Sequence, residues 1–187
     1  MLEYTWAMRH AALNDLPAAL LLTAVLFDLA GWALKRETLR AVGFWTLWAG
    51  VVGGWAAYVT GRLAEDSIDH GEAIHQLMQQ HERLALYVMV LFTAILVWKL
   101  WRRGSLSSIE DLVARLVGIV GLALLVVTAA LGGRLVFEHA AGVSNAHIIA
   151  EAQDRGIELP AAPVGATDSA SAQPAHQHAP GTPPHEH

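Results

Sequence analysis

The sequence has no cysteine and little charge: charged residues make up 16% of its 187 positions, compared with roughly one-quarter in soluble domains. The absence of cysteine excludes disulfides, thiolate metal sites, iron–sulfur clusters and covalently attached c-type haem. A net charge of −5 offers no basic surface, so a nucleic-acid partner is excluded. The first residues lack the basic segment and cleavage site of a secretory signal, and we expect no cleaved leader.

Motifs of catalysis are missing as well. The chain has no nucleotide-binding loop, no His-Glu-x-x-His zinc motif and no nucleophile elbow. We therefore do not expect an enzyme that acts on its own.

Apolar residues, in contrast, are abundant and are gathered into long windows. They make up 54% of the chain, and the windows lie at about 17–34, 42–61, 84–101 and 112–132. About 20 apolar residues suffice for a helix to cross the hydrocarbon core, and these windows are apolar on all sides. Backbone polar groups in lipid must be paired within the segment. The sequence therefore predicts an all-α fold, a four-helix transmembrane bundle with antiparallel up-down topology, with Pro17 in the first turn of its first helix.

The domain organisation follows from these windows. We expect a four-span membrane domain over residues 1–150, with a long external loop at 62–83. An external tail over residues 151–187 is rich in Pro, Ala and His; it cannot bury enough apolar surface to fold, so we expect it to be disordered. No internal repeat is evident in the sequence.

The orientation follows from the basic residues, which concentrate on the cytoplasmic side of membrane proteins. They follow the first and third spans, whereas the 62–83 loop is rich in acidic residues. Five tryptophans lie near the same two basic ends, as an interfacial aromatic belt would. Both termini and the 62–83 loop are therefore predicted to lie outside. The residues that carry this prediction are Lys35, Arg36, Arg40, Lys99, Arg102, Arg103, Trp32, Trp45, Trp48, Trp98 and Trp101.

All ten histidines fall on the predicted external side. His10, His81 and His139 lie near the outer ends of spans one, three and four, which antiparallel packing brings together, and they are the candidate cofactor ligands. Two imidazoles from different helices could be the axial ligands of one b-type haem. Of the methionines, Met78 is expected near these histidines and Met89 is not.

A divalent metal is the alternative cofactor, because imidazole combined with carboxylate suits Cu, Zn or Ni. The candidate ligands in and around the loops are His70, His75, His147, Glu65 and Asp66, and the tail adds a loose site. The third interpretation is that no cofactor binds and that the histidines are solvated at the interface. The external segments are simply longer than the internal ones, so a one-sided distribution does not decide between the three. The tail candidates are His176, His178, His185 and His187.

Two further features predict helix packing. Asp28 in the first span and Arg115 in the fourth lie near the inner interface; a charge at the bilayer centre costs ~2.5–3.5 kcal/mol on insertion scales, so we expect them to pair as a clamp rather than as a proton relay. Small residues at intervals of four in the second span permit close helix approach. They serve either the bundle interior or a homo-oligomer contact, and include Ala49, Gly53, Ala57 and Gly61.

The order of "RHAALNDLPAALLL", "GGWAAYVTGRLAED", "HERLALYV" and "GGRLVFEHAAGV" resembles the bacterial membrane family catalogued as domain of unknown function 2231. The resemblance covers residues 8–143. Its most specific element is a Gly-Gly-x-Leu-Val-aromatic-x-His-x-x-Gly-Val run, matched here by Gly132, Gly133, Leu135, Val136, Phe137, His139, Gly142 and Val143.

The resemblance implies a four-helix fold in the bacterial cytoplasmic (inner) membrane, with His10, His81 and His139 at family-like positions and the external side periplasmic. Relatives open with His-Pro and, four residues later, His-Phe-Pro. Here Asp15 stands where relatives have the second histidine, so a ligand at that position is lost or replaced by a carboxylate. The family's setting beside respiratory components implies partners among respiratory or other membrane-complex subunits.

Two functions remain open from the sequence. The first is a redox-associated or metal-handling subunit with its histidine cluster at the outer face. The second is a cofactor-free structural or accessory subunit of a larger membrane complex. A visible spectrum and a metal analysis would separate them.

Overall fold

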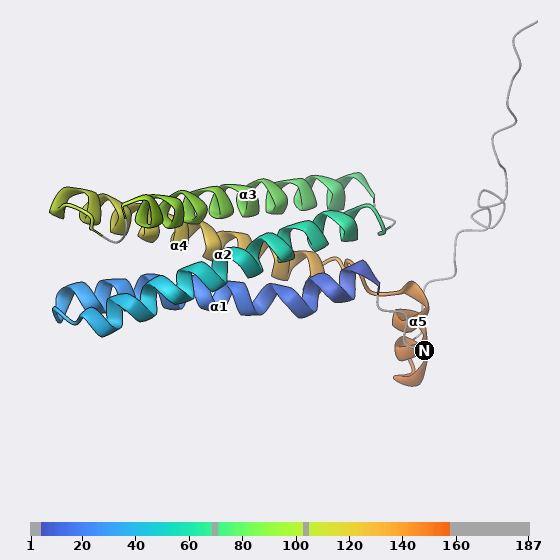
Figure 1. The fold of residues 1–187 in the computed structure, drawn as a ribbon. Coiled ribbons are helices and arrows are strands. Elements are labelled where there is room, and N and C mark those ends of the chain that lie inside the picture. The colour runs from blue at the N-terminus through green and yellow to red at the C-terminus, as the bar shows by residue number, and fades with distance from the viewer. Residues whose placement is uncertain (1–4, 69–70, 103–104, 158–187) are drawn as a thin grey trace, which may run out of the picture. The chain divides into compact units, whose positions relative to one another are not determined.

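The computed structural model describes residues 5–68, 71–102 and 105–157. These residues form five helices and no strand, and the first four helices are long and apolar enough to cross a membrane. The predicted all-α fold with four transmembrane helices is therefore confirmed, and Figure 1 shows the four long helices running up and down beside one another. The helices are α1 (Trp6–Ala33), α2 (Glu37–Glu65), α3 (Glu72–Trp101), α4 (Ser108–Phe137) and α5 (Asn145–Asp154).

All four long helices extend beyond the apolar windows that predicted them. α1 begins at Trp6 rather than near residue 17, and α3 begins at Glu72 rather than near residue 84. At 1.5 Å per residue, helices of 28–30 residues are roughly 42–45 Å long, more than the ~30 Å hydrocarbon core. Most of the expected 62–83 loop is consequently helical, because its polar residues form the last turn of α2 and the first turns of α3.

Pro17 differs from its expected position for the same reason. The first turn of α1 is set by Thr5, whose side chain accepts a hydrogen bond from the Met8 backbone N–H at 3.3 Å. Pro17 therefore lies inside the helix, where it is buried and packs against Gly53 of α2. Membrane helices tolerate such a proline because neighbouring helices compensate for the missing hydrogen bond.

Two helical hairpins make up the bundle. α1 packs most extensively against α2, and α3 against α4, while α2 also contacts α3 and α1 contacts α4. The order around the bundle is thus α1–α2–α3–α4, which puts α1 and α3 on opposite corners. Phe92, Leu21 and Val88 are the largest fully buried side chains between them.

The two hairpins repeat each other at a spacing of 71 residues. His10 bonds to the carbonyl of Ala57, and His81 bonds to that of Thr128. Two pairs of equivalent positions also contact each other directly, Asp28 with Lys99 and Arg40 with Asp111, each 71 residues apart. Equivalent positions can touch only beside a symmetry axis, so an approximate two-fold axis runs along the bundle. The sequence hides this repeat because few residues beyond His10/His81, Gly50/Gly121 and Gly61/Gly132 are identical.

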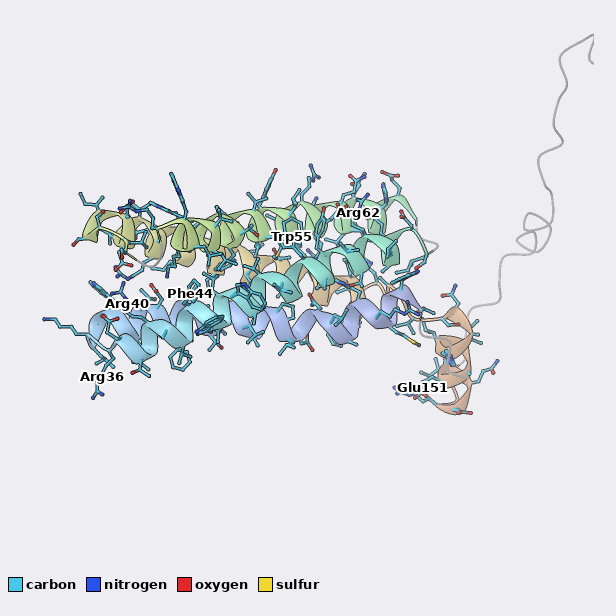
Figure 2. All side chains as sticks on the ribbon, in the orientation of Figure 1. Arg36, Arg40, Phe44, Trp55, Arg62 and Glu151 are labelled. Atoms are coloured by element: carbon cyan, nitrogen blue, oxygen red, sulfur yellow. The ribbon has the colours of Figure 1, made fainter. Side chains whose placement is uncertain are left out.

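For clarity, the end of the bundle with the α2–α3 connection is called the histidine end, and the end with the α1–α2 and α3–α4 connections the arginine end. Figure 2 shows Arg36 and Arg40 at the arginine end and Arg62 toward the histidine end.

The chain after Val143 forms a second unit. Its one described helix, α5, has no buried residue and includes Glu151, labelled in Figure 2. The expected domain boundary at 150/151 falls inside this helix. Residues 158–187, which hold most of the expected tail, lie outside the described residues.

Candidate functional site: a histidine pair between opposite helices

His10 on α1 and His81 on α3 make the same contact with the next helix of their own hairpin. The His10 Nδ1 atom lies 2.9 Å from the Ala57 carbonyl oxygen, and the His81 Nδ1 atom lies 2.9 Å from the Thr128 carbonyl oxygen. Because a carbonyl oxygen can only accept, each Nδ1–H donates the hydrogen bond. In the neutral ring the lone pair is then on Nε2, which is how metal-bound histidines are usually oriented.

Glycines make room for both rings. Gly61 and Gly132 each stand four residues after the carbonyl that a ring binds, so they lie on the same face of the helix one turn later. A Cβ atom on Gly61 would lie 3.0 Å from His10 Cε1, and a Cβ atom on Gly132 would lie 3.0 Å from His81 Cε1. A Cβ atom at either position would force the ring to shift by a few tenths of an ångström.

Both histidines line one cavity of about 70 Å³ near the histidine end. The wall is made almost wholly of equivalent pairs from the two hairpins, such as Pro17 with Val88 and Gly54 with Leu125. The cavity therefore lies on the two-fold axis, with one imidazole from each of two opposite helices.

The chemistry of the wall is apolar apart from a few groups. Asn14, Tyr58 and Thr128 contribute polar atoms, and no aspartate or glutamate is among the lining residues. Met89 also lines the cavity and fills the space that the absent side chain of Gly54 leaves, contrary to the expectation that only Met78 lies near the histidines. Two neutral imidazoles in an apolar cavity do not offset the charge of a metal ion. They therefore suit a group whose own negative charges offset the charge of its metal.

His139 is exposed and does not line this cavity. α4 continues to Phe137, so His139 falls in the turn beyond the helix. The same segment contains Gly142, which adopts φ +83° and would bring a Cβ atom 3.1 Å from Ala7. The C-terminal part of the family-like motif therefore closes the histidine end, while Gly132 within it admits the His81 ring.

The candidate divalent-metal ligands are only partly brought together. His75 Nδ1 lies 3.8 Å from Glu65 Oε1, whereas Asp66 is exposed where α2 ends, and His147 is exposed on α5 in the second unit. Across the described residues, no group of three or more His, Cys, Asp or Glu side chains is arranged to hold a metal ion. The remaining candidates, His70, His176, His178, His185 and His187, lie outside the described residues.

A polar network that the sequence analysis missed adjoins the cavity. Tyr58 lines the cavity and donates a hydrogen bond from its hydroxyl to Glu82 Oε1 at 2.9 Å. Arg62 Nη1 donates to Glu82 Oε2 at 2.6 Å and lies 3.7 Å from Glu65 Oε2. Two carboxylates therefore share one guanidinium. The sequence indicated this network only through the position of Glu82 directly after His81. Both residues fell in the expected 62–83 loop, and the longer α3 places them on a helix instead.

The arginine end holds a second, ionic cluster. Lys99 Nζ donates to Asp28 Oδ1 at 2.7 Å, and Arg115 Nε lies 3.4 Å from Asp28 Oδ2. Asp111 Oδ2 accepts hydrogen bonds from Arg40, at 2.7 Å, and from Arg115. The structure thus brings Asp28 and Arg115 together, and joins them to partners that the sequence analysis had placed in loops or left unassigned.

This cluster ties all four long helices together. Asp28 comes from α1, Arg40 from α2, Lys99 from α3, and Asp111 and Arg115 from α4. Asp28, Asp111 and Arg115 are each at most 9% exposed. Buried charges are stable only when they are paired, and here each of these three charged groups has an ionic partner from the cluster.

The comparisons with known proteins agree with this architecture. The sequence profile of a family described as "Predicted membrane protein (DUF2231)" matches residues 9–145. No curated protein matches the chain, and no solved structure matches it. The matched range contains all four long helices apart from the first turn of α1, and with them His10, His81 and His139.

Proposed function

The chain belongs to the DUF2231 family of membrane proteins, and we propose that its bundle holds one redox cofactor, a b-type haem, between His10 and His81. The observation that carries the proposal is the pair of histidines at equivalent positions, each held through Nδ1, that line one cavity from opposite helices. Bundles commonly build cofactor sites from side chains on facing helices. Bis-imidazole ligation without cysteine is a known form of haem attachment.

The surrounding residues favour haem over a divalent ion. A divalent ion takes three or four protein ligands, whereas the cavity offers two imidazoles and no carboxylate. A bound haem would supply reversible one-electron transfer, while His10 and His81 hold it and the apolar wall excludes water.

The space must widen for a porphyrin. Pockets for organic ligands measure ~300–1,000 Å³, several times the cavity of about 70 Å³. Met89 is the wall residue that moves most readily, because its unbranched side chain has three rotatable bonds. The adjacent part of the lining consists of small residues, namely Ala18, Gly54 and Ala85.

A second candidate needs far less space than a porphyrin. A single copper(I) ion needs little space and carries one charge, and imidazole and thioether ligands both suit it. His10, His81 and Met89 would be its ligands. This protein would then handle or transfer copper rather than hold haem.

The proposal extends to the setting of the site. The α1–α2 and α3–α4 connections carry Lys35, Arg36 and Arg103, whereas residues 66–71 between α2 and α3 contain no Lys or Arg. This asymmetry supports an orientation with the histidine end outside, which in the bacterial cytoplasmic membrane is the periplasmic side. The partners would be electron-carrying subunits of a membrane complex.

A reduced-minus-oxidised visible spectrum of the detergent-purified protein tests the proposal, with iron and copper measured on the same sample. We expect a b-type signal and about one iron per chain. His10→Ala and His81→Ala should each abolish the signal, and His139→Ala is the matched control that should keep it. Stoichiometric copper without a chromophore would select the second candidate. A colourless, metal-free protein would reject both and favour a cofactor-free accessory subunit.

A further inference from the structure

α5, the helix of the second unit, has its apolar and its polar residues on different sides. With 3.6 residues per turn, Ile148, Ile149 and Ala152 share one face of the helix. Ile148 and Ile149 are 40% and 45% exposed, and no residue of α5 is buried. Among the described residues, nothing therefore covers this apolar face. The opposite side carries His147, Glu151, Asp154 and Arg155.

The C-terminal end of α5 enlarges the apolar face. The Ile157 N–H donates to the Ala152 carbonyl and the Gly156 N–H donates to the Gln153 carbonyl, both at 2.9 Å. These two hydrogen bonds form a Schellman motif, which Gly156 permits by adopting φ +67°. The motif turns the chain back, so that Ile157 returns to the side of the helix on which Ala152 lies. Ile157 is also exposed, and it adds a third isoleucine to the face.

α5 is too short to be stable in water by itself. It has 10 residues, and isolated helices shorter than ~12–15 residues are marginal in water. Ser144 at its N-cap forms no side-chain cap hydrogen bond. Arg155 pairs with Glu151 at 2.6 Å, but exposed ion pairs contribute little. The main stabilisation of α5 must therefore come from burial of its apolar face.

The position of α5 in the chain brings a suitable surface within reach. α4 has 30 residues and is about 45 Å long, as long as a bilayer together with its headgroups. A membrane-spanning α4 therefore ends, at Phe137, in or beside the headgroup region. Residues 138–144 connect this end to α5, and a connection of that length spans at most roughly 25 Å. The apolar face of α5 can thus always reach the bilayer surface.

We propose that α5 lies flat on the membrane at the histidine end, where α4 ends, with Ile148, Ile149 and Ile157 inserted below the lipid headgroups and its charged side in water. Amphipathic helices bind the interface in this way, with the apolar face buried about 5–10 Å deep. The short connection to α4 raises the effective concentration of the surface, so a small apolar face is sufficient. The inference does not depend on the proposed cofactor.

The charges of α5 indicate which lipids it needs. With His147 neutral, Glu151, Asp154 and Arg155 give residues 145–157 two negative charges and one positive charge, a net charge of −1. Anionic lipids attract interfacial helices whose polar face is rich in Lys and Arg, and they offer no such attraction here. Binding should therefore depend on apolar burial and not on the content of anionic lipid.

A cysteine scan of residues 146–153 tests the inference in the full chain, which has no cysteine of its own. Each single-cysteine variant is labelled with an environment-sensitive fluorophore and placed in vesicles of phosphatidylethanolamine and phosphatidylglycerol, with or without lipid spin-labelled near the headgroup. We expect a blue-shifted emission that the spin-labelled lipid quenches at Ile148→Cys, Ile149→Cys and Ala152→Cys. Glu151→Cys is the matched control, whose label should emit as in water and be quenched by dissolved iodide.

The scan separates the lipid surface from other partners. Blue shift and lipid quenching that recur with the helical period of 3.6 residues would support the proposal, whereas equal exposure of all labels to water would overturn it. Blue-shifted labels that the lipid does not quench would also overturn it, because protein would then cover α5. Replacing phosphatidylglycerol by phosphatidylcholine should leave the pattern unchanged, and loss of the quenching would overturn apolar burial as its cause. Because α5 has no buried residue, these substitutions should leave the bundle intact.

Discussion

At the residue scale, the site depends on a relation between a histidine and a glycine on the next helix. A Cβ atom on the residue four positions after the bound carbonyl would crowd the imidazole, so the contact favours a glycine there. Gly61 and Gly132 occupy this position for His10 and His81. Gly133, the neighbour of Gly132, has no atom within 4 Å of the place where its Cβ would be. Two adjacent glycines of one motif therefore have different roles.

Gly132→Ala and Gly133→Ala provide a matched test of that difference. Each substitution replaces glycine inside α4, which favours the helix by up to ~1 kcal/mol. At Gly132 the new methyl group lies 3.0 Å from the His81 ring, so we expect loss of the His81–Thr128 hydrogen bond, which is worth about 0.5–1.5 kcal/mol. Gly132→Ala should thus unfold at a lower temperature in detergent than Gly133→Ala and should bind less cofactor. Equal behaviour of the two variants would refute the role of Gly132.

The histidine pair itself could be predicted from the sequence in part. His10 and His81 could be placed at one end because antiparallel spans alternate in direction. His139 could not be excluded, because its position depends on where α4 ends, and the polar turns that extend these helices carry no hydropathy signal. Tyr58 and Glu82 were missed for the same reason: their contact needs the last turns of α2 and the first turns of α3 to be helical.

At the scale of elements, the hairpins are joined by ion pairs at the arginine end. Contacts between equivalent positions pair opposite charges, Asp28 with Lys99 and Arg40 with Asp111. Two identical hairpins would bring like charges together at these positions, which is destabilising. The cluster therefore favours the pairing of the first hairpin with the second over the pairing of either with a copy of itself.

Asp28→Asn should test how much this cluster contributes. It leaves Lys99 and Arg115 buried without their shared carboxylate, and breaking a buried pair costs about 3–5 kcal/mol. Asp28→Asn combined with Lys99→Met should be less destabilised than Asp28→Asn alone, because Arg115 keeps Asp111 and no unpaired lysine remains. The measurement is thermal unfolding in detergent.

The control for that cycle is the exposed pair Arg134–Glu138, in which both side chains are about half exposed. Glu138→Gln should change the free energy of unfolding by no more than about 1 kcal/mol, as surface pairs do. If Asp28→Asn is as mild as the control, the cluster is not a clamp.

The sequence predicted that the four helices exist more readily than it predicted which residues pair between them. An apolar window of twenty residues has one structural solution in lipid, whereas Asp28 and Arg115 alone did not reveal that Lys99 completes their pairing. Lys99 was assigned to the basic cytoplasmic loop after the third span. Its long side chain instead reaches inward to Asp28.

At the scale of the whole molecule, the two-fold relation gives the bundle two different ends. Its axis passes through the cavity lined by His10 and His81 at the histidine end and through the ionic cluster at the arginine end. The proposed cofactor would then lie toward one side of the membrane, and the ion pairs that join the hairpins toward the other. The proposed function therefore depends on which end faces outward.

Single-cysteine labelling can determine that orientation, and the chain is suited to it because it has no cysteine of its own. Ser67 follows α2 at the histidine end and Ser105 precedes α4 at the arginine end, and both are exposed. We expect Ser67→Cys to react with a membrane-impermeant maleimide in cells whose outer membrane is permeabilised, and Ser105→Cys to react only after the inner membrane is broken. Basic connections stay in the cytoplasm during insertion, which is the physical reason for this order. The reverse order would put His10 and His81 toward the cytoplasmic side, and the proposed cofactor would then exchange electrons with partners in the cytoplasm instead.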